Sequence, residues 1–116
     1  MKNIFFIGLF VIGLNINAQN KSGVITTTLL VKGNCEDCKK RIENAADIKG
    51  VKFFEWSPET KVAKVIYIDS KTNIETIEKA IASKGYDTPT QTGNLTAYNK
   101  LPSCCQYRTN VCTEKK

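Results

Sequence analysis

A chain of 116 residues is long enough for one domain and not for two. Its net charge is +6 and it has no histidine, which removes the commonest general base of enzymes and the commonest nitrogen ligand of metals. No other catalytic acid–base set is visible, so we do not expect an enzyme. Met1 is the single methionine, which leaves five cysteines as the soft ligands of the chain.

Residues 1–18 have the layout of a secretory signal peptide. Lys2 precedes an uncharged apolar run, and a polar stretch ends in the small residue Ala18. The apolar run has about a dozen residues, whereas a membrane-spanning helix needs roughly 20. We therefore expect cleavage after Ala18, a mature chain that begins at Gln19, a periplasmic location and no membrane embedding; an uncleaved anchor is the alternative. An exported protein does not routinely meet nucleic acid, so we interpret the basic charge as a solvated surface.

Residues 19–92 are expected to form one domain, in which residues 23–92 alternate between β-branched apolar runs and helical patterns. Glycines end both helical patterns, Pro58 presets a turn between two strands, and Thr72 or Asn73 can cap the second helix. The predicted strands are 24–31, 51–56, 61–68 and 86–91, and the predicted helices are 36–48 and 73–84. This order predicts an α+β, ferredoxin-like βαββαβ fold, with a four-stranded antiparallel sheet and two helices on one face. Residues 93–116 are predicted to form a polar, irregular tail that carries the other cysteines.

The motif that carries chemistry is Cys35-Glu36-Asp37-Cys38, which lies at the start of the first predicted helix. Two thiols at this spacing can point at one spot, and a helix N-terminus stabilises thiolates, the species that binds metal. Two thiolates suit Cu(I), whereas a closed zinc site needs four ligands. The cationic run Lys39-Lys40-Arg41 can offset the charge of a bis-thiolate ion, although Glu36 and Asp37 oppose that effect.

Three interpretations of this motif compete. Metal capture is the first, a thioredoxin-like redox motif is the second, and a structural disulfide in an oxidising compartment is the third. The redox fold needs a longer chain and usually a proline or glycine inside the motif. We therefore favour metal capture.

A larger pattern resembles the heavy-metal-associated (HMA) domain of copper chaperones, copper-exporting P-type ATPases and the periplasmic mercury-binding protein. The positions that carry the resemblance are residues 33–45 (GNCEDCKKRIENA), Gly50-Val51, Ile81 and Gly85-Tyr86-Asp87. The resemblance implies a ferredoxin-like fold, metal ligation by Cys35 and Cys38, and a place near the metal loop for Tyr86. It also implies that four sheet residues face the helices, namely Phe54, Trp56, Val65 and Tyr67.

One position departs from the family pattern. The family usually carries methionine two residues before the first cysteine, with its side chain tucked under the metal loop, and here that place is Gly33. We expect this change to weaken the apolar anchor of the loop without removing a ligand.

Cys104, Cys105 and Cys112 lie outside the resemblance, and their role stays open. Cys104 or Cys105 can form a bridge to Cys112, or the tail can turn back and add Cys104 and Cys105 to the first site, or the thiols stay free. An odd number of cysteines leaves at least one outside intramolecular pairs. A closed site of three or four thiolates would favour storage and let Zn(II) compete with copper.

The sequence thus predicts an exported soft-metal-binding protein. The expected ion is Cu(I), with Hg(II) as the main alternative and Zn(II) possible, and the expected partner besides the ion is a metal-transporting membrane protein. A periplasmic thiol–disulfide protein and a structural domain stapled by two bridges are the alternatives from other classes.

Overall fold

The computed structural model describes residues 23–110, so residues 1–22, with the predicted signal peptide, and Cys112 lie outside the described part. The described strands are β1 (Val24–Leu30), β2 (Val51–Trp56) and β3 (Val62–Ile68). The described helices are α1 (Glu36–Ala45), α2 (Ile74–Ala82) and α3 (Leu95–Asn99), followed by the 3-10 turn η2 (Ser103–Cys105). Between residues 23 and 110, no helix has the length and apolar character needed to cross a bilayer.

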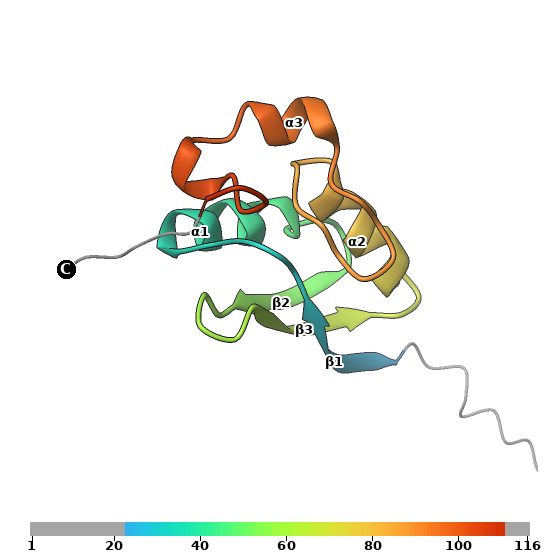
Figure 1. Cartoon of the computed structure of the whole chain (residues 1–116). Coiled ribbons are helices and arrows are strands. Elements are labelled where there is room, and N and C mark those ends of the chain that lie inside the picture. The colour runs from blue at the N-terminus through green and yellow to red at the C-terminus, as the bar shows by residue number, and fades with distance from the viewer. Residues whose placement is uncertain (1–22, 111–116) are drawn as a thin grey trace, which may run out of the picture.

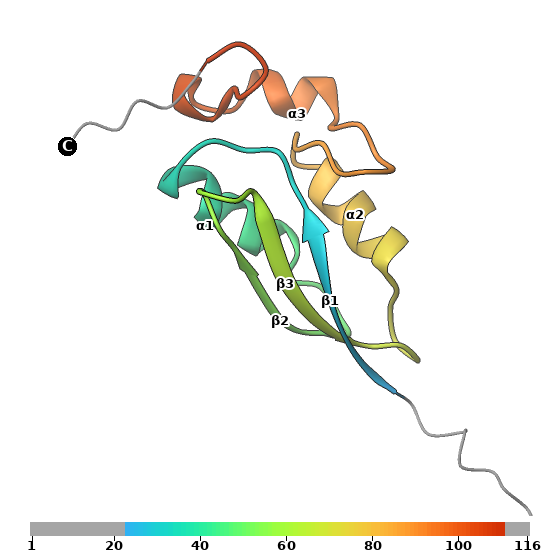
Figure 2. The same cartoon turned by 60° about the horizontal axis from the view of Figure 1, so that its bottom comes forward.

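The sheet is antiparallel, with the order β1-β3-β2. Helices α1 and α2 cover one of its faces, as predicted (Figures 1 and 2). Ile25 pairs with Tyr67 across β1 and β3, and Phe54 pairs with Val65 across β2 and β3. This arrangement is the ferredoxin-like one, with β3 at the centre of the sheet.

The predicted fourth strand, residues 86–91, is not confirmed, because the sheet of the described residues has three strands. A backbone hydrogen bond of 3.0 Å from Lys32 N–H to Asp87 O joins this segment to the chain that follows β1. Beyond it, the buried carboxylate of Glu78 on α2 accepts hydrogen bonds from the Thr88 hydroxyl and the Thr90 N–H. The segment also contains Pro89, which has no N–H to donate to a sheet. The Thr88 hydroxyl and the Thr90 N–H therefore pair with a helix instead of a strand.

The core lies between the sheet and the two helices. Trp56, Val65 and Tyr67 are buried and Phe54 is partly buried, which confirms the expected helix-facing set. Helix α2 begins where predicted, because the Asn73 side chain accepts a hydrogen bond of 2.8 Å from Thr76 N–H.

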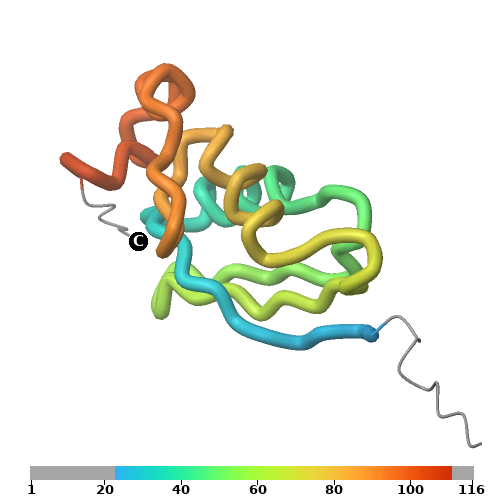
Figure 3. The backbone as a smooth tube through the Cα atoms, turned by 90° about the vertical axis from the view of Figure 1, so that its right-hand side faces the viewer, coloured from blue at the N-terminus to red at the C-terminus, as the bar shows by residue number. Residues whose placement is uncertain are grey.

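The segment from residue 93 to residue 110 covers one end of the domain. Figure 3 shows this orange and red part of the chain at the end of the molecule where the chain enters α1. Its residues Tyr98, Leu101 and Cys105 are buried in the same apolar cluster as the domain core. The chain crosses itself closely at Gly93, where an added Cβ would lie 2.5 Å from the carbonyl carbon of Gly85. The segment predicted to be irregular thus has a defined path over the domain.

Candidate metal centre

The loop between β1 and α1 places the two cysteines of the motif differently. Cys35 is the N-cap residue of α1, and its carbonyl accepts hydrogen bonds from Cys38 N–H (2.9 Å) and Lys39 N–H (3.1 Å). Cys38 lies in the first turn, and its side chain is fully buried. The helix N-terminus presents its partial positive charge here, while Glu36 and Asp37 add negative charge to the same turn.

The oxidation states of the described cysteines differ. Cys35 is disulfide-bonded. Its partner is not a described cysteine, because Cys38, Cys104 and Cys105 are free thiols; the remaining cysteine, Cys112, lies outside the described residues. Cys35 and Cys38 therefore do not form a disulfide with each other. A bridge from Cys104 or Cys105 to Cys112 is absent too, and three free thiols among five cysteines exclude two stapling bridges.

A tail cysteine lies beside the motif. The Sγ atoms of Cys38 and Cys105 are 2.6 Å apart, and both residues have no exposed surface. Burial and the neighbouring Cys38 raise the pKa of Cys105 well above its usual value. Cys104 is more exposed, and its Sγ faces the Asp37 carboxylate at 3.6 Å. The tail thus returns to the motif, but its two cysteines reach different surroundings.

Tyr86 lies beside this thiol pair. Its side chain has no exposed surface, and its hydroxyl has no hydrogen-bond partner among the described residues. Burial raises the pKa of Tyr86, and the adjacent Cys105 and Cys38 raise it further. The position of Tyr86 beside the cysteines agrees with what the resemblance implied.

The sequence matches the heavy-metal-associated domain over residues 27–87, which is more than half of the chain. The chain belongs to the heavy-metal-associated domain family. Domains of this family bind soft metals such as Cu(I) or Hg(II).

Solved structures of HMA domains resemble this one. The CopZ metallochaperone is 33% identical, with a TM-score of 0.53, over 55% of this chain and 98% of CopZ. The oxidised form of MerP from Ralstonia metallidurans CH34 is 32% identical, with a TM-score of 0.55, over 60% of this chain and all of MerP. The water-soluble region of the P-type ATPase CopA from Bacillus subtilis is 27% identical, with a TM-score of 0.53, over 59% of this chain and 46% of that region. A comparison with curated protein sequences finds no significant match.

The unusual Gly33 of this HMA domain has a structural reason. A Cβ at this position would lie 2.9 Å from Cδ1 of Ile42 and 3.1 Å from Cη2 of Trp56. The Trp56 indole is buried, and its Nε1–H donates a hydrogen bond of 2.9 Å to Val31 O. The indole therefore packs under the loop, and the expected loss of an apolar anchor is wrong. Trp56 was identified as a core residue, but nothing in the sequence linked it to the loop.

One positive charge at the loop comes from a residue outside the expected run Lys39-Lys40-Arg41. Lys39 makes an ion pair with Glu43 (2.6 Å) and donates to Trp56 O, so its charge is already engaged. Lys61 instead donates to Asn34 O at 3.0 Å from the turn before β3. Its backbone has a left-handed φ of 66°, uncommon for a residue with a side chain. Sequence reasoning missed Lys61, because a turn lysine carries no signal of this contact.

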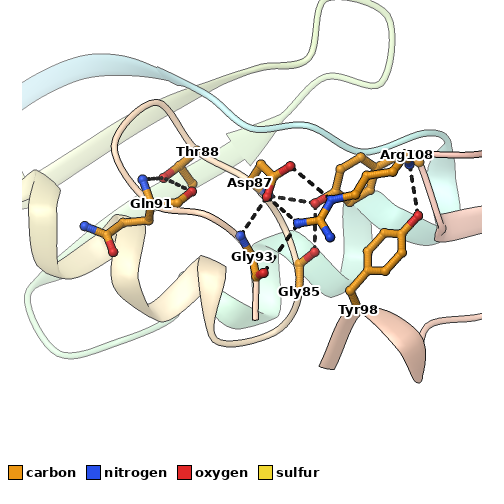
Figure 4. Close-up of polar contacts among 8 residues, drawn as sticks. Gly85, Asp87, Thr88, Gln91, Gly93, Tyr98 and Arg108 are labelled. Atoms are coloured by element: carbon orange, nitrogen blue, oxygen red, sulfur yellow. Dashed lines mark hydrogen bonds and ion pairs between the residues drawn. The ribbon is translucent and has the colours of Figure 1, made fainter. Parts of the chain in front are cut away.

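Two sets of polar contacts hold the tail against the HMA domain. Asn34, inside the metal loop, donates from Nδ2 to Cys104 O (2.8 Å) and to Asn110 O (3.0 Å). Asp87 forms an ion pair of 2.7 Å with Arg108, and its carboxylate also accepts from Gly93 N–H (Figure 4). These contacts fix the part of the tail that carries Cys105.

Tyr107 lies within the second set. Its hydroxyl donates to Gly85 O at 2.8 Å and accepts from Asp87 N–H at 2.9 Å. Its ring stacks on Tyr86 and meets Tyr98 edge-on. Burial raises the pKa of Tyr107 to about 12. Tyr107 thereby joins the tail to the segment that carries Tyr86.

The donor set as it stands is a pair of thiols and not a larger cluster. Between residues 23 and 110, no three cysteine, aspartate or glutamate side chains are grouped so as to hold a metal ion. The predicted ligand Cys38 is a free buried thiol, whereas the predicted ligand Cys35 must be reduced before its sulfur can bind metal.

Proposed function

We propose that this HMA domain is an exported Cu(I) carrier or scavenger, in which Cys38 is the central ligand and Cys35 is the second ligand when its thiol is reduced. The observation that carries the proposal is the buried free thiol of Cys38 in the first turn of α1. Cu(I) accepts few ligands and prefers thiolates, and the chain has no histidine to compete. The likeness to the CopZ metallochaperone supports copper as the ion.

Transfer would proceed by thiolate exchange. A thiol of the partner attacks the bound ion, a three-coordinate intermediate forms, and one original thiolate leaves with a proton. The likeness to the soluble region of CopA supports a metal-transporting membrane protein as the partner. Lys61, close to Asn34, offers positive charge that would stabilise an anionic bis-thiolate ion beside the loop.

Hg(II) is the second candidate ion, because MerP is similar over its whole length. Mercury and copper share the thiolate pair, so the donor set alone does not separate them. Elemental analysis of anaerobically purified protein, followed by competition between the two ions, decides which is carried.

The first prediction concerns Cys38. Replacing Cys38 by Ser should weaken Cu(I) binding by more than about 100-fold, beyond the roughly 10- to 100-fold typical of losing a residue that merely supports a ligand. Competition with a chromogenic chelator measures it, and Cys104→Ser is the matched control. Undiminished binding by a Cys35→Ser/Cys38→Ser double variant would contradict the proposal.

Export is part of the same proposal, and it rests on the layout of residues 1–18. Mass spectrometry of the protein from the cell envelope should give a chain that begins at or within a residue or two of Gln19. A full-length chain in the cytoplasm would refute export and leave the metal site unaffected.

A further inference from the structure

The thiol nearest to Cys38 comes from the tail and not from the motif. Cys38 and Cys105 are both free and fully buried, and their sulfur atoms are 2.6 Å apart although 67 residues separate them in the chain. The two side chains therefore converge on one buried spot from distant parts of the chain. Two sulfurs that converge in this way can become a pair of donors for one small ion once they move apart.

We propose that Cys105 is a metal ligand, and that Cys38 and Cys105 together hold a soft ion such as Cu(I) while Cys35 is engaged in its disulfide. This inference rests on the proposed function and names a second thiolate pair for the same cargo. Cys38 belongs to both pairs. The oxidation state of Cys35 then determines which second thiol binds the ion together with Cys38. That thiol is Cys35 in the reduced chain and Cys105 in the disulfide-bonded chain.

Binding at this pair needs two deprotonations and a small movement. Each S–H loses its proton to solvent as a metal–sulfur bond forms, and the ion keeps its oxidation state. With a metal–sulfur bond of about 2.3 Å, the sulfurs of a near-linear site lie about 4.6 Å apart, so the thiols must separate by about 2 Å. Cys105 ends the single turn η2, and a shift of one short turn is a small rearrangement compared with a movement of α1.

The environment of the Tyr86 hydroxyl is an independent observation that indicates an anionic group bound beside it. It is buried and lacks a hydrogen-bond partner among the described residues, and such groups are costly unless something satisfies them. Both Cys105 and Cys38 lie close enough to Tyr86 to act on it electrostatically. The Cys105 sulfur lies within reach of this hydroxyl, and a metal-bound thiolate there is a stronger hydrogen-bond acceptor than the neutral thiol.

The attachment of the tail keeps Cys105 next to Cys38. Asn34 holds the carbonyl of Cys104, the residue next to Cys105, from within the metal loop. Tyr107, two residues beyond Cys105, is held between Gly85 and Asp87. Cys105 is thus positioned from both of its sides before any ion binds, which reduces the ordering cost of binding.

Cys104 does not share this role. Its Sγ is oriented toward the Asp37 carboxylate in an exposed contact of 3.6 Å, whereas the Cys105 sulfur meets Cys38 in the buried interior. Cys104→Ser is therefore a matched control, because it removes a free thiol adjacent to Cys105 without changing the buried pair.

The test uses the protein purified anaerobically without a thiol reductant, so that the Cys35 disulfide stays intact, and a thiol count under denaturing conditions verifies this state. Cu(I) affinity is measured by chelator competition, and sulfur neighbours are counted by X-ray absorption. Cys105→Ser should weaken Cu(I) binding by more than about 100-fold and reduce the sulfur neighbours from two to one. Cys104→Ser should change neither. Cys105→Ala, with a thermal unfolding measurement for all variants, separates loss of a ligand from loss of folding.

The possible results of this test separate a failure of Cys105 as a ligand from a failure of the proposed function. If folded Cys105→Ser keeps wild-type affinity and two sulfur neighbours, Cys105 is not a ligand and the proposed function stands. If the unreduced wild-type protein binds no Cu(I) because Cys38 and Cys105 have oxidised to a disulfide, the inference is overturned as well. If the fully reduced wild-type protein also fails to bind, the proposed function falls with it.

Discussion

The metal loop and the C-terminal segment meet at the same thiol pair but are held there by different forces. The loop rests on apolar packing, in which the buried indole of Trp56 lies against Gly33 and Ile42. The tail combines apolar burial of Tyr98, Leu101 and Cys105 with hydrogen bonds and the partly exposed ion pair between Asp87 and Arg108. Apolar packing of this kind scarcely responds to pH, whereas ionised contacts do. The attachment of the tail therefore has a pH-dependent part that the packing of the loop lacks.

The largest expected effect is on the loop side. Trp56→Ala should lower the free energy of unfolding by about 3–5 kcal/mol, because it empties a large core site and frees Val31 O from its hydrogen bond. Chemical denaturation measures it. Trp56→Phe is the control that keeps an apolar ring, and it should lower the free energy of unfolding by clearly less than Trp56→Ala. If mutations in the tail lowered the free energy of unfolding by the same amount, the loop and the tail would not differ in the way described.

A smaller effect is expected on the tail side from Asp87→Asn. This change removes the ion pair with Arg108 and weakens the contact with Gly93 N–H, at a cost of about 2 kcal/mol to the attachment of the tail. Hydrogen exchange of the amides in residues 103–110 should accelerate, while exchange in β3 stays unchanged. Uniform acceleration in both places would mean that tail and core unfold as one unit.

Asp87 also gives the attachment a pH dependence. Burial alone would raise the pKa of this carboxyl, but hydrogen bonds from Arg108 and Gly93 hold it below its usual value. A group with a depressed folded pKa stabilises the structure above its unfolded pKa, about 3.9, and that stability is lost as pH falls through the folded pKa. The tail should therefore loosen below about pH 4, and Asp87→Asn should flatten that response. Glu78, whose pKa is depressed by Thr88 and Thr90 against the effect of burial, contributes in the same window and remains in the variant.

The smallest effect should come from the residue that joins the two regions. Asn34→Ala removes the hydrogen bonds to Cys104 O and Asn110 O, for a loss of about 1 kcal/mol. Its readout is the reactivity of the Cys105 thiol toward an alkylating reagent, which should increase. If reactivity is unchanged, the aromatic contacts of Tyr107 hold the tail by themselves.

The sequence predicted the HMA architecture well where local pattern and core packing agree. Strands β1, β2 and β3 and both main helices lie close to their expected bounds, because alternation and helical spacing are sequence-local signals. The prediction of a strand at residues 86–91 was wrong. The alternation of Tyr86, Thr88 and Thr90 is typical of a strand, but the polar groups of Thr88 and Thr90 pair with Glu78 on α2.

The site was only partly accessible to sequence reasoning. The C-x-x-C motif identified Cys38, and the return of the tail was one of the open alternatives. Which tail cysteine reaches Cys38 depends on contacts made by Asn34 and Tyr107 over long sequence separations, and no periodicity encodes these. Nor does the motif reveal that Cys35 is disulfide-bonded, since pairing depends on the spatial arrangement of cysteines.

The crossing of Gly93 over Gly85 has a consequence for how this chain tolerates sequence change. Gly85 has a φ of +102°, and backbone atoms of Ala97 and Tyr98 already occupy the space that its side chain would need. Any side chain at either position would push two stretches of backbone apart, and neither can yield by choosing another rotamer. Loop positions usually accept substitution freely. Here a pair of loop glycines fixes the direction in which the tail leaves the domain, so a variant library should find them as restrictive as positions of the hydrophobic core.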